Sequence, residues 1–532
     1  MQQLLLGDEA IAQGAIDAGI SGVYAYPGTP STEIMEYIQH NAEIQSKEIH
    51  CRWSSNEKTA LEAALGMSYA GKRSIVCMKH VGLNVAADPF MNAALTGVNG
   101  GLIIVSADDP SMHSSQNEQD SRFFGKFALL PVLEPTNQQE AYNMMHYGLQ
   151  MSEDLKVPVL LRITTRLAHS RTGISRIEER KQNPLSIPAD LKQFILLPAM
   201  ARVKYKRLLQ IQQEFEEKAY VSEFNQFIQG EDTRLGIISC GIAQNYILEN
   251  VKEAGLKYPI LKISQYPFPK KLIDKLTSIC KTIMVFEEGY PLIEEQLKGI
   301  IDHGHVIKGR LSGDIPRDGE LNPSIVSKAL GLSGTSASKI PEIVVNRPPQ
   351  LCKGCSHIDT YLALNEAISK YSVGRVFSDI GCYTLGALPP FNSINTCVDM
   401  GASITMAKGA ADAGLVPAIA VIGDSTFTHS GMTGLLDAIL ENTPITVIIS
   451  DNETTGMTGG QPSMATNKLE KICLGLGVDP DHIKVIVPLK KNHEQNVQII
   501  ANEVAFKGIS VIISQRECIQ TAARRARSKQ EA

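Results

Sequence analysis

The stretch that decides the fold spans residues 421–461 and reads VIGDSTFTHSGMTGLLDAILENTPITVIISDNETTGMTGGQ. An apolar run over residues 417–422 predicts a buried strand that ends in Gly423-Asp424-Ser425. Residues 431–440 have helical character, and a second apolar run over 445–450 predicts another strand. The pattern therefore indicates a strand–helix–strand unit of a parallel sheet, with polar side chains at the carboxyl end of each strand.

The polar residues after both strands suit a divalent cation that holds a diphosphate. Hard cations such as Mg²⁺ take oxygen ligands, and they need few protein carboxylates where phosphate and water oxygens supply the rest. Asp424 would give a carboxylate, Asn452 a side-chain oxygen and Thr454 a backbone carbonyl. The pattern is typical of thiamine diphosphate sites, whereas an ordinary strand–turn–helix with a capping Asp424 would explain the first turn alone.

Further cofactor contacts are expected around these two turns. Glycines in the second loop let backbone N–H groups approach phosphate oxygens closely. A small-residue helix start at 399–403 is suited to lie against a cofactor. The candidates for cofactor contact, besides the three metal ligands, are Gly423, Ser425, Gly456, Met457, Thr458, Cys382, Met400 and Gly401.

Length and composition restrict the class of protein. With 532 residues the chain is too long for one core, and 43% hydrophobic with 20% charged residues is typical of a soluble globular protein. A net charge of −5 gives no electrostatic case for nucleic acid, and no apolar run has the length of a membrane span. The N-terminus has no basic segment of a signal peptide and the ten cysteines are scattered, so we expect a cytoplasmic protein.

Residues 1–170 alternate predicted strands and helices and indicate a first α/β unit. A helix over 8–19 leads to a strand over 22–26 and to the turn PGTPSTE at 27–33. Ser31 and Thr32 stand where they could cap the next helix. A threonine beside a helix N-terminus is equally suited to bind a carboxylate, because the N–H groups and the dipole favour an anion.

Glu57 opens an alanine-rich helix in the segment NEKTALEAALG at 56–66. A glutamate in a first helical turn usually serves the helix dipole. Thiamine diphosphate, however, needs a carboxylic acid beside its pyrimidine ring to become reactive, and a partly buried glutamate at a helix start can provide it. With the stretch at 421–461 in the same chain, Glu57 is therefore our candidate for activating the cofactor.

Two further predicted strands, over 74–78 and 101–107, are each followed by a polar loop that contains a histidine. One loop histidine is more often structural than catalytic, but histidines on successive strand ends favour a ligand site. The candidates for substrate contact are Lys79, His80, His113, Ser115 and Asn117.

The remaining sequence divides into three regions. Residues 171–230 are charged and irregular and indicate a linker or helical excursion. Residues 231–335 alternate strands and helices without a catalytic cluster, and the pair Glu287-Glu288 is expected at the surface or at an interface. Residues 351–532 contain the opening stretch and form the last α/β unit.

Only Cys352 and Cys355 form a CxxC pair. Because no second pair and no ligand-spaced histidine follow, we do not expect a four-ligand zinc site. The run of four closely spaced cysteines that binds an iron–sulfur cluster is absent as well, so we expect no cluster motif in this chain.

Taken together, the motifs resemble those of the large subunits of indolepyruvate:ferredoxin oxidoreductases, within the 2-oxoacid:ferredoxin oxidoreductase family. The resemblance covers nearly the whole chain apart from the linker, and several of the motifs are long. The matching segments are YPGTPSTEI (26–34), NEKTALEAALG (56–66), MKHVGLNVAADP (78–89), ADDPSMHSSQNEQD (107–120), TTRLAHSR (164–171), CKGCSH (352–357), DIGCYTLGALPP (379–390), MGASI (400–404), GDSTFTHSGMTGL (423–435) and DNETTGMTGGQ (451–461).

The resemblance implies an α/β, thiamine-diphosphate-binding fold with two doubly wound parallel-sheet cofactor domains. Residues 1–170 would bind the pyrimidine, 231–335 would form a transketolase C-terminal-like α/β domain, and 351–532 would bind the diphosphate and Mg²⁺. By motif, the implied roles are these: Glu57 activates the cofactor; Asp424, Asn452 and Thr454 hold Mg²⁺; Thr29 or Thr32 meets the substrate carboxylate; His80, Asn84 and His113 line the reaction space.

The family oxidatively decarboxylates aryl 2-oxoacids such as indolepyruvate and phenylpyruvate with coenzyme A. The products are aryl-acetyl-CoA, CO₂ and reduced ferredoxin. The resemblance also implies a smaller partner subunit, and we expect a homodimeric core within the hetero-oligomer.

One departure from the family concerns the electrons. The family's large subunit continues after a segment like REC (516–518) into a ferredoxin-like domain, whereas this sequence ends at Ala532. Either a partner chain carries the clusters, or another acceptor takes the electrons, or the chain is a non-oxidative thiamine-dependent decarboxylase or carboligase. A cofactor-retaining scaffold that assembles a complex is the non-enzymatic alternative.

Overall fold

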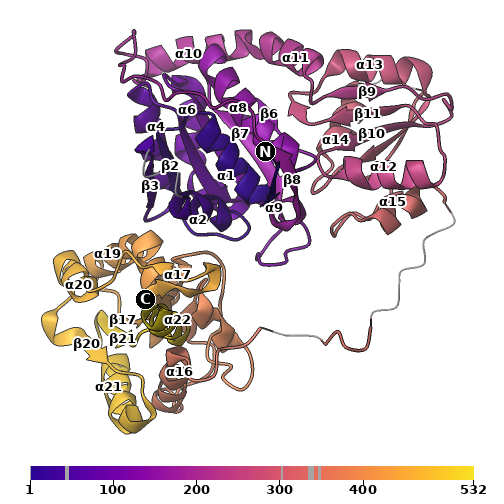
Figure 1. Cartoon of the computed structure of the whole chain (residues 1–532). Helices are drawn as coiled ribbons and strands as arrows, with labels where there is room; N and C mark the ends of the chain where they lie inside the picture. The colour runs from indigo at the N-terminus through magenta and orange to yellow at the C-terminus, as the bar shows by residue number, and fades with distance from the viewer. Residues whose placement is uncertain (1, 42–46, 301–303, 333–340, 346–348, 532) are drawn as a thin grey trace. The chain divides into compact units, whose positions relative to one another are not determined.

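The computed structural model describes residues 2–41, 47–300, 304–332, 341–345 and 349–531, and it divides into two compact units, Met1–Lys339 and Ile340–Ala532 (Figure 1). The finer division into a pyrimidine-binding domain, a linker and a transketolase-like domain stays a prediction. Within the described ranges no helix combines the length and the apolar character that a membrane crossing requires.

A seven-stranded sheet with the order β12-β6-β7-β5-β4-β2-β3 forms the centre of the first unit. Every neighbouring pair is parallel except β12 with β6. Each residue of β4 and β5 is buried, as expected where helices cover both faces of a sheet. The strands are β2 (Gly22–Ala25), β3 (His50–Trp53), β4 (Ser74–Lys79), β5 (Leu102–Asp108), β6 (Val132–Leu133), β7 (Val159–Thr164) and β12 (Gln265–Tyr266).

The helices of this part bury apolar stripes against the sheet. In α2, Ile34, Met35 and Ile38 are fully buried at helical spacing. Helix α1 packs against α2 and α8, and α4 packs against α6. The helices are α1 (Gly7–Asp17), α2 (Thr32–His40), α4 (Glu57–Tyr69), α5 (His80–Val85), α6 (Ala87–Thr96), α7 (Ser121–Ala128), α8 (Gln138–Leu155) and α9 (Thr165–His169).

A second sheet of the first unit has the order β14-β13-β10-β11-β9, in which only β9 is antiparallel. One hydrophobic core joins both sheets, and β12 from this region extends the large sheet. The elements are β9 (Gln226–Ile228), β10 (Gly236–Cys240), β11 (Ile260–Ile263), β13 (Thr282–Phe286), β14 (Val306–Lys308), α10 (Pro198–Gln210), α11 (Gln212–Val221), α12 (Ala243–Glu253), α13 (Lys270–Ile279), α14 (Leu292–Ile300) and α15 (Pro323–Ala329).

The acidic pair after β13 lies inside the protein. Glu287 and Glu288 are each 1% exposed, so the expectation of a surface position is wrong, and both side chains are buried inside the first unit. The Arg122 guanidinium lies 3.1 Å from Glu287 and donates to the Glu288 carbonyl at 2.9 Å. Burying a carboxylate is costly unless a cation is close, and Arg122 from the large-sheet region supplies that cation.

The sequence pattern missed the first strand. The sequence pattern predicts no strand before the helix at 8–19, but β1 (Gln2–Leu6) pairs antiparallel with β8 (Arg171–Ser175). Both strands are short, and most of β8 is exposed, so no run of alternating apolar residues marks them. This ribbon brings the start of α1 next to the end of α9.

The second unit contains a five-stranded, entirely parallel sheet with the order β15-β16-β17-β21-β20. In β16, Ala418, Ala420 and Ile422 enter one hydrophobic core, whereas Ile419 and Val421 enter another. Because side chains alternate along a strand, the two cores lie on opposite faces of the sheet. Helices α17 and α19 supply residues to the first core, and α16 and α21 supply residues to the second.

These two covered faces confirm the prediction of a doubly wound parallel sheet for this unit. The elements are α16 (Ser356–Ala367), β15 (Val376–Ser378), η1 (Cys382–Ala387), α17 (Ala402–Asp412), β16 (Ala418–Gly423), α18 (Asp424–Thr426), the π-helical turn η2 (Phe427–Gly431), α19 (Met432–Leu440), β17 (Ile445–Asp451), β18 (Thr454–Thr455), η3 (Gly456–Thr458), β19 (Gln461–Pro462), α20 (Leu469–Leu476), η4 (Pro480–His482), β20 (Ile483–Ile486), η5 (Lys490–Asn492), α21 (His493–Ala505), β21 (Ser510–Gln515) and α22 (Ile519–Glu531).

Candidate active site

Asp424 lies where β16 ends and α18 begins, as the sequence predicted. Its side chain is 2% exposed, and its Oδ2 has no hydrogen-bond partner among the described residues. Burial and, to a smaller extent, the nearby Asp451 carboxylate raise the pKa of Asp424 to about 7. A buried, unpartnered carboxylate oxygen beside a second acid is the arrangement that a bound cation would stabilise.

The second turn places its polar groups beside the first. Ser425 Oγ lies 3.0 Å from Thr455 Oγ1, which joins the residues after β16 to those after β17. Asn452 Oδ1 accepts a hydrogen bond from Thr454 N at 3.1 Å, and the Thr454 hydroxyl donates to the Gln461 carbonyl at 3.0 Å. The two predicted turns therefore meet at one edge of the sheet, and the antiparallel pair β18–β19 holds the second turn.

Two residues at this edge were not among the predicted site residues. Asp451 ends β17, is 2% exposed, and accepts from Gln515 Nε2 at 2.9 Å. His357 is 2% exposed with Nε2 3.5 Å from Asn452 Nδ2, and burial lowers its pKa to about 4, so it is neutral at pH 7. The quoted motifs contain both residues, but their approach to Asn452 and Asp424 depends on the fold.

The other predicted cofactor contacts surround this edge. Asp379 is fully buried, and its Oδ2 accepts from the backbone N–H groups of Gly401 and Ser403, each at 3.2 Å, which fixes the start of α17 after the half-buried Met400. At Gly423, a Cβ atom would lie 2.6 Å from the Tyr383 ring, so only glycine fits there.

The loop after Thr455 is more open. Gly456 is exposed, Met457 is 59% exposed, and the Thr458 hydroxyl donates to Gln461 Oε1 at 2.5 Å. At Gly456, a Cβ atom would lie 3.0 Å from the sulfur of Cys382. Cys382 therefore borders the second turn, whereas the Met457 side chain points largely to solvent.

A cavity of about 100 Å³ opens beside these turns within the second unit, and four cysteines contribute to its wall. The wall also includes His357, Asn452 and Gly456. Spacing along the sequence found only the CxxC pair, because the other two cysteines follow the distant strands β15 and β21. The four cysteines are Cys352, Cys355, Cys382 and Cys518.

The four thiols lie too far apart to bind one zinc ion as they stand. Sulfur ligands of a tetrahedral zinc ion are about 3.8 Å apart, because Zn–S bonds are about 2.3 Å long. In the described parts of the chain, no three cysteine sulfurs lie within 4.8 Å of one another. Burial and, to a smaller extent, the thiols of Cys355 and Cys518 raise the pKa of Cys382 to about 12. The four cysteines therefore line one cavity without forming a tetrahedral single-ion site.

In the first unit, Glu57 begins α4 and is 5% exposed. Asn56, not Glu57, caps this helix, because Asn56 Oδ1 accepts from Thr59 N at 2.8 Å. A Cβ atom at Gly82 would lie 2.5 Å from Glu57 Oε1, so the carboxylate occupies the space that a side chain at Gly82 would take. Glu57 is thus a buried acid packed against the helix α5 that follows β4.

Lys79 and His80 are buried where β4 ends. Lys79 Nζ donates to the Ser114 carbonyl at 2.6 Å. Burial lowers the pKa of Lys79 to about 8, although the negative charge of Asp109 partly offsets this effect. His80 Nε2 lies 3.2 Å from the Asn117 carbonyl, and its Nδ1 has no hydrogen-bond partner among the described residues. The loops after β4 and β5 therefore meet, as parallel strand order requires.

The turn after β2 joins the same edge. The Lys79 side chain lies against Gly28, where a Cβ atom would be 3.2 Å from Lys79 Cβ. Thr32 Oγ1 accepts from Gly28 N at 3.0 Å, and the Ser31 hydroxyl donates to the Gly28 carbonyl at 2.8 Å. The capping prediction for Ser31 and Thr32 is therefore wrong, since both hydroxyls hold the turn instead of the helix end.

Three predicted contacts lie nearer to solvent. Thr29 is half-buried, and its carbonyl accepts from Ser114 Oγ at 3.5 Å. Asn84 is exposed on α5. His113 is exposed too, and its Nε2 lies 3.5 Å from Glu320 Oε2. The structure brings Thr29 to the strand-end loops, whereas the Asn84 and His113 side chains are exposed.

Comparison with known proteins shows which family the chain belongs to. Residues 13–202 match the family model "Pyruvate flavodoxin/ferredoxin oxidoreductase, thiamine diP-bdg", and residues 379–523 match "Thiamine pyrophosphate enzyme, C-terminal TPP binding domain". The protein named indolepyruvate oxidoreductase subunit IorA of Methanothermobacter thermautotrophicus is 36% identical over 97% of this chain and 86% of its own length. The chain belongs to the indolepyruvate oxidoreductase IorA family.

Another member of this family, the protein of the same name from Archaeoglobus fulgidus, is 36% identical over 99% of this chain and 88% of its own length. Family membership confirms the recognised resemblance and makes the chain an oxidoreductase with thiamine-diphosphate-binding domains. A solved 2-oxoglutarate:ferredoxin oxidoreductase from Magnetococcus marinus aligns with a TM-score of 0.48 and 17% identity, over 58% of this chain and 62% of that one.

Proposed function

We propose that this member of the IorA family catalyses the thiamine-diphosphate-dependent oxidative decarboxylation of aryl 2-oxoacids of the indolepyruvate type. Coenzyme A would take the acyl group and ferredoxin the electrons, with a smaller partner subunit and a homodimeric core. The proposal is supported by the name of the relatives, which refers to indolepyruvate and to a subunit, and by two sets of buried polar residues.

The residues at the edge of the second unit fit a diphosphate held by Mg²⁺. Asp424 offers a buried oxygen without a partner, Asn452 offers an amide oxygen, and Thr454 lies in the same turn. Gly423 and Gly456 keep side chains away from the space next to these ligands. We propose that Asp424, Asn452 and Thr454 hold Mg²⁺, which anchors the diphosphate.

Residues of the first unit would act at the end of the cofactor where the reaction takes place. When bound, thiamine diphosphate supplies the nucleophile that takes up a 2-oxoacid and releases CO₂. Glu57 would hold a proton at its carboxyl group toward the aminopyrimidine, which a buried acid at the start of α4 can do. Thr29, Thr32 and the Lys79 ammonium would bind the substrate carboxylate, since the turn after β2 and Lys79 pack together.

The four-cysteine cavity is the observation that favours an oxidative reaction over simple decarboxylation. Cys352, Cys355, Cys382 and Cys518 surround a space that also borders Asn452. A non-oxidative decarboxylase has no use for four converging thiols, whereas an iron–sulfur cluster beside the cofactor would take electrons from it. We propose that these thiols hold such a group, in addition to any clusters on a partner chain.

An anaerobic assay with indolepyruvate, coenzyme A and a viologen dye tests the proposal. We expect dye reduction that depends on both substrates and that is lost in the Glu57→Gln variant. The Asp424→Ala variant should lose Mg²⁺-dependent retention of thiamine diphosphate, and unchanged retention would refute the metal assignment. Aldehyde formation without dye reduction would instead identify a non-oxidative decarboxylase.

A further inference from the structure

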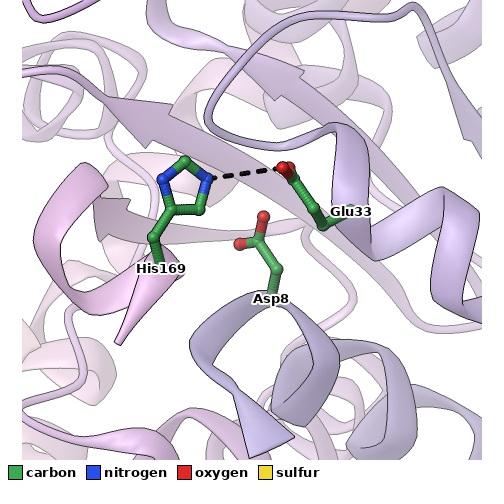
Figure 2. Close-up of side chains that lie close together, drawn as sticks. All are labelled: Asp8, Glu33 and His169. Atoms are coloured by element: carbon green, nitrogen blue, oxygen red, sulfur yellow. Dashed lines mark ion pairs between the residues drawn. The ribbon is translucent and has the colours of Figure 1, made fainter. Parts of the chain in front are cut away.

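A second group of potential metal ligands lies in the first unit, among three helices. Asp8 is in the first turn of α1, Glu33 is in the first turn of α2, and His169 ends α9. Figure 2 shows the three side chains pointing toward one another. One ligand atom from each lies within 4.8 Å of the other two, and His169 Nε2 is 3.6 Å from Glu33 Oε1.

No hydrogen bond from the described residues offsets the cost of burying the Asp8 carboxylate. Its side chain is 0% exposed, and neither carboxylate oxygen receives a hydrogen bond from any described residue. Glu33 Oε2 is also buried without a donor. Asp8 is buried beside the half-buried Glu33, and two neighbouring carboxylates in such a place need either a shared proton or a cation to be stable.

We propose that Asp8, Glu33 and His169 ligate a divalent cation of the Mn²⁺ or Zn²⁺ type. Two carboxylates and one imidazole are the mixed oxygen and nitrogen set that first-row metals prefer over Ca²⁺ or Mg²⁺. Ligand atoms around such an ion are about 3.0–3.4 Å apart, because metal–ligand bonds are about 2.1 Å long. Rotamer adjustments of less than about 2 Å would therefore close the site.

The surroundings favour a cation over a shared proton. His169 Nε2 lies 3.6 Å from Glu33 Oε1 as an ion pair, which gives Glu33 a partner but leaves both Asp8 oxygens without a hydrogen bond from any described residue. A hollow of about 490 Å³, lined in part by Glu9, Glu33 and Glu36, opens beside the cluster. Its acidic wall attracts cations, and its size provides an access route and room for water ligands.

The site would fix the start of α2. Glu33 follows Thr32, whose hydroxyl oxygen accepts the hydrogen bond that holds the turn at Gly28. A metal ion bound by Glu33, Asp8 and His169 would connect α2 to α1 and α9. Helix α9 is distant from the other two in sequence. The cation would thus position the turn after β2 without touching the substrate. The proposal does not depend on the proposed reaction, because the ligands and the test concern metal binding alone.

Binding of Mn²⁺ to the full-length protein, followed by the EPR signal of the free ion, tests the proposal. The Asp424→Ala background removes the expected cation site of the second unit. In that background we expect one bound Mn²⁺ per chain, which Zn²⁺ displaces. The Glu33→Gln variant and, separately, the His169→Asn variant should each bind Mn²⁺ at least tenfold more weakly. Glu36→Gln removes the same charge one turn later on α2 and should change affinity less than threefold.

A thermal measurement separates metal loss from misfolding. Mn²⁺ should raise the melting temperature of the Asp424→Ala protein and of its Glu36→Gln derivative, and it should leave that of the Glu33→Gln derivative unchanged. The absence of bound Mn²⁺ in the Asp424→Ala background overturns the proposal. Equal Mn²⁺ affinity in the background and in both folded ligand variants overturns it as well, and identifies a shared proton between Asp8 and Glu33.

Discussion

At the scale of single residues, the buried aspartates Asp8 and Asp424 each have a carboxylate oxygen without a hydrogen-bond partner among the described residues. Asp8 lies at the start of α1, and Asp424 lies at the start of α18. Both positions are favourable for a negative charge, because helix N-termini carry exposed N–H groups. The helix N-terminus does not offset the free-energy cost of burying a carboxylate oxygen without a hydrogen bond. Each aspartate therefore indicates a bound cation that is not part of the polypeptide.

The contact between Glu57 and Gly82 gives a prediction for the first unit. Gly82→Ala would place a Cβ atom 2.5 Å from Glu57 Oε1 and so displace the carboxylate. We expect a loss of turnover of at least tenfold, with unchanged Mg²⁺-dependent retention of thiamine diphosphate. Steady-state dye reduction and a filter-binding assay measure the two quantities. Full activity in Gly82→Ala would show that the position of Glu57 is not critical.

Lys79 gives a prediction about pH. Burial lowers its pKa to about 8 in the folded protein, from about 10.4 in an unfolded chain. Between these values the unfolded chain binds the proton that the folded chain has lost, so the folded state gains stability as pH rises. Relative to Lys79→Met, the wild-type free energy of unfolding should increase by up to about 3 kcal/mol between pH 7 and pH 10.

Denaturant titrations of wild type and Lys79→Met at both pH values measure this difference. All other titrating groups are common to the two proteins and cancel in the comparison. A difference that is independent of pH would mean that the folded Lys79 keeps an ordinary pKa and is hydrated.

At the scale of elements, a buried ionic network joins the two sheets of the first unit. Arg122 is fully buried, contacts Asp120 at 2.5 Å and Glu287 at 3.1 Å, and donates to backbone carbonyls near Glu288. Arg122→Met would leave these carboxylates buried without their cation, which costs about 3–5 kcal/mol. We expect a correspondingly lower free energy of unfolding for the first unit, measured by denaturant titration.

Arg234→Met is the matched control for Arg122→Met. Arg234 pairs with Asp232 at 2.6 Å, but its side chain is 84% exposed. Such exposed pairs contribute little to stability, because water solvates both charges when they separate. An equally small effect at Arg122 would show that the network adds no stability.

The elements that could be predicted from the sequence are those with long apolar patterns. The strands at 417–422 and 445–450 were predicted nearly to the residue, because each is an apolar run that ends in a polar turn. The short strands β1 and β8 carry no such pattern, and they form because they pair with each other. Strand β12 is two residues long and likewise depends on its partner, β6.

The same distinction applies to the candidate site. Asp424, Asn452 and Glu57 follow strands or begin helices, so local sequence located them. The grouping of Cys382 and Cys518 with the CxxC pair depends on strand order in the sheet, which local spacing does not contain. The approach of Asp8 to Glu33 and His169 likewise depends on how α1, α2 and α9 pack.

At the scale of the whole molecule, each unit holds a different part of the proposed chemistry. The buried acid Glu57 is in the first unit, and the expected metal ligands and the four-cysteine cavity are in the second. In the proposed reaction, release of CO₂ would need the acid and the cofactor, whereas transfer of electrons to an acceptor would need the group that we propose the thiols hold. These steps should therefore be separable by mutation.

The prediction concerns Cys355→Ser. After anaerobic reconstitution this variant should contain less iron than wild type, and dye reduction should fall at least a hundredfold, since one thiolate ligand is lost. A stoichiometric amount of CO₂ should still form from indolepyruvate, because Glu57 and Asp424 are intact. Cys397→Ser is the control, since Cys397 is exposed in the same unit and does not line the cavity. Equal iron content and equal dye reduction in both variants would place the electron route outside this cavity, and would leave clusters on a partner chain as the acceptor.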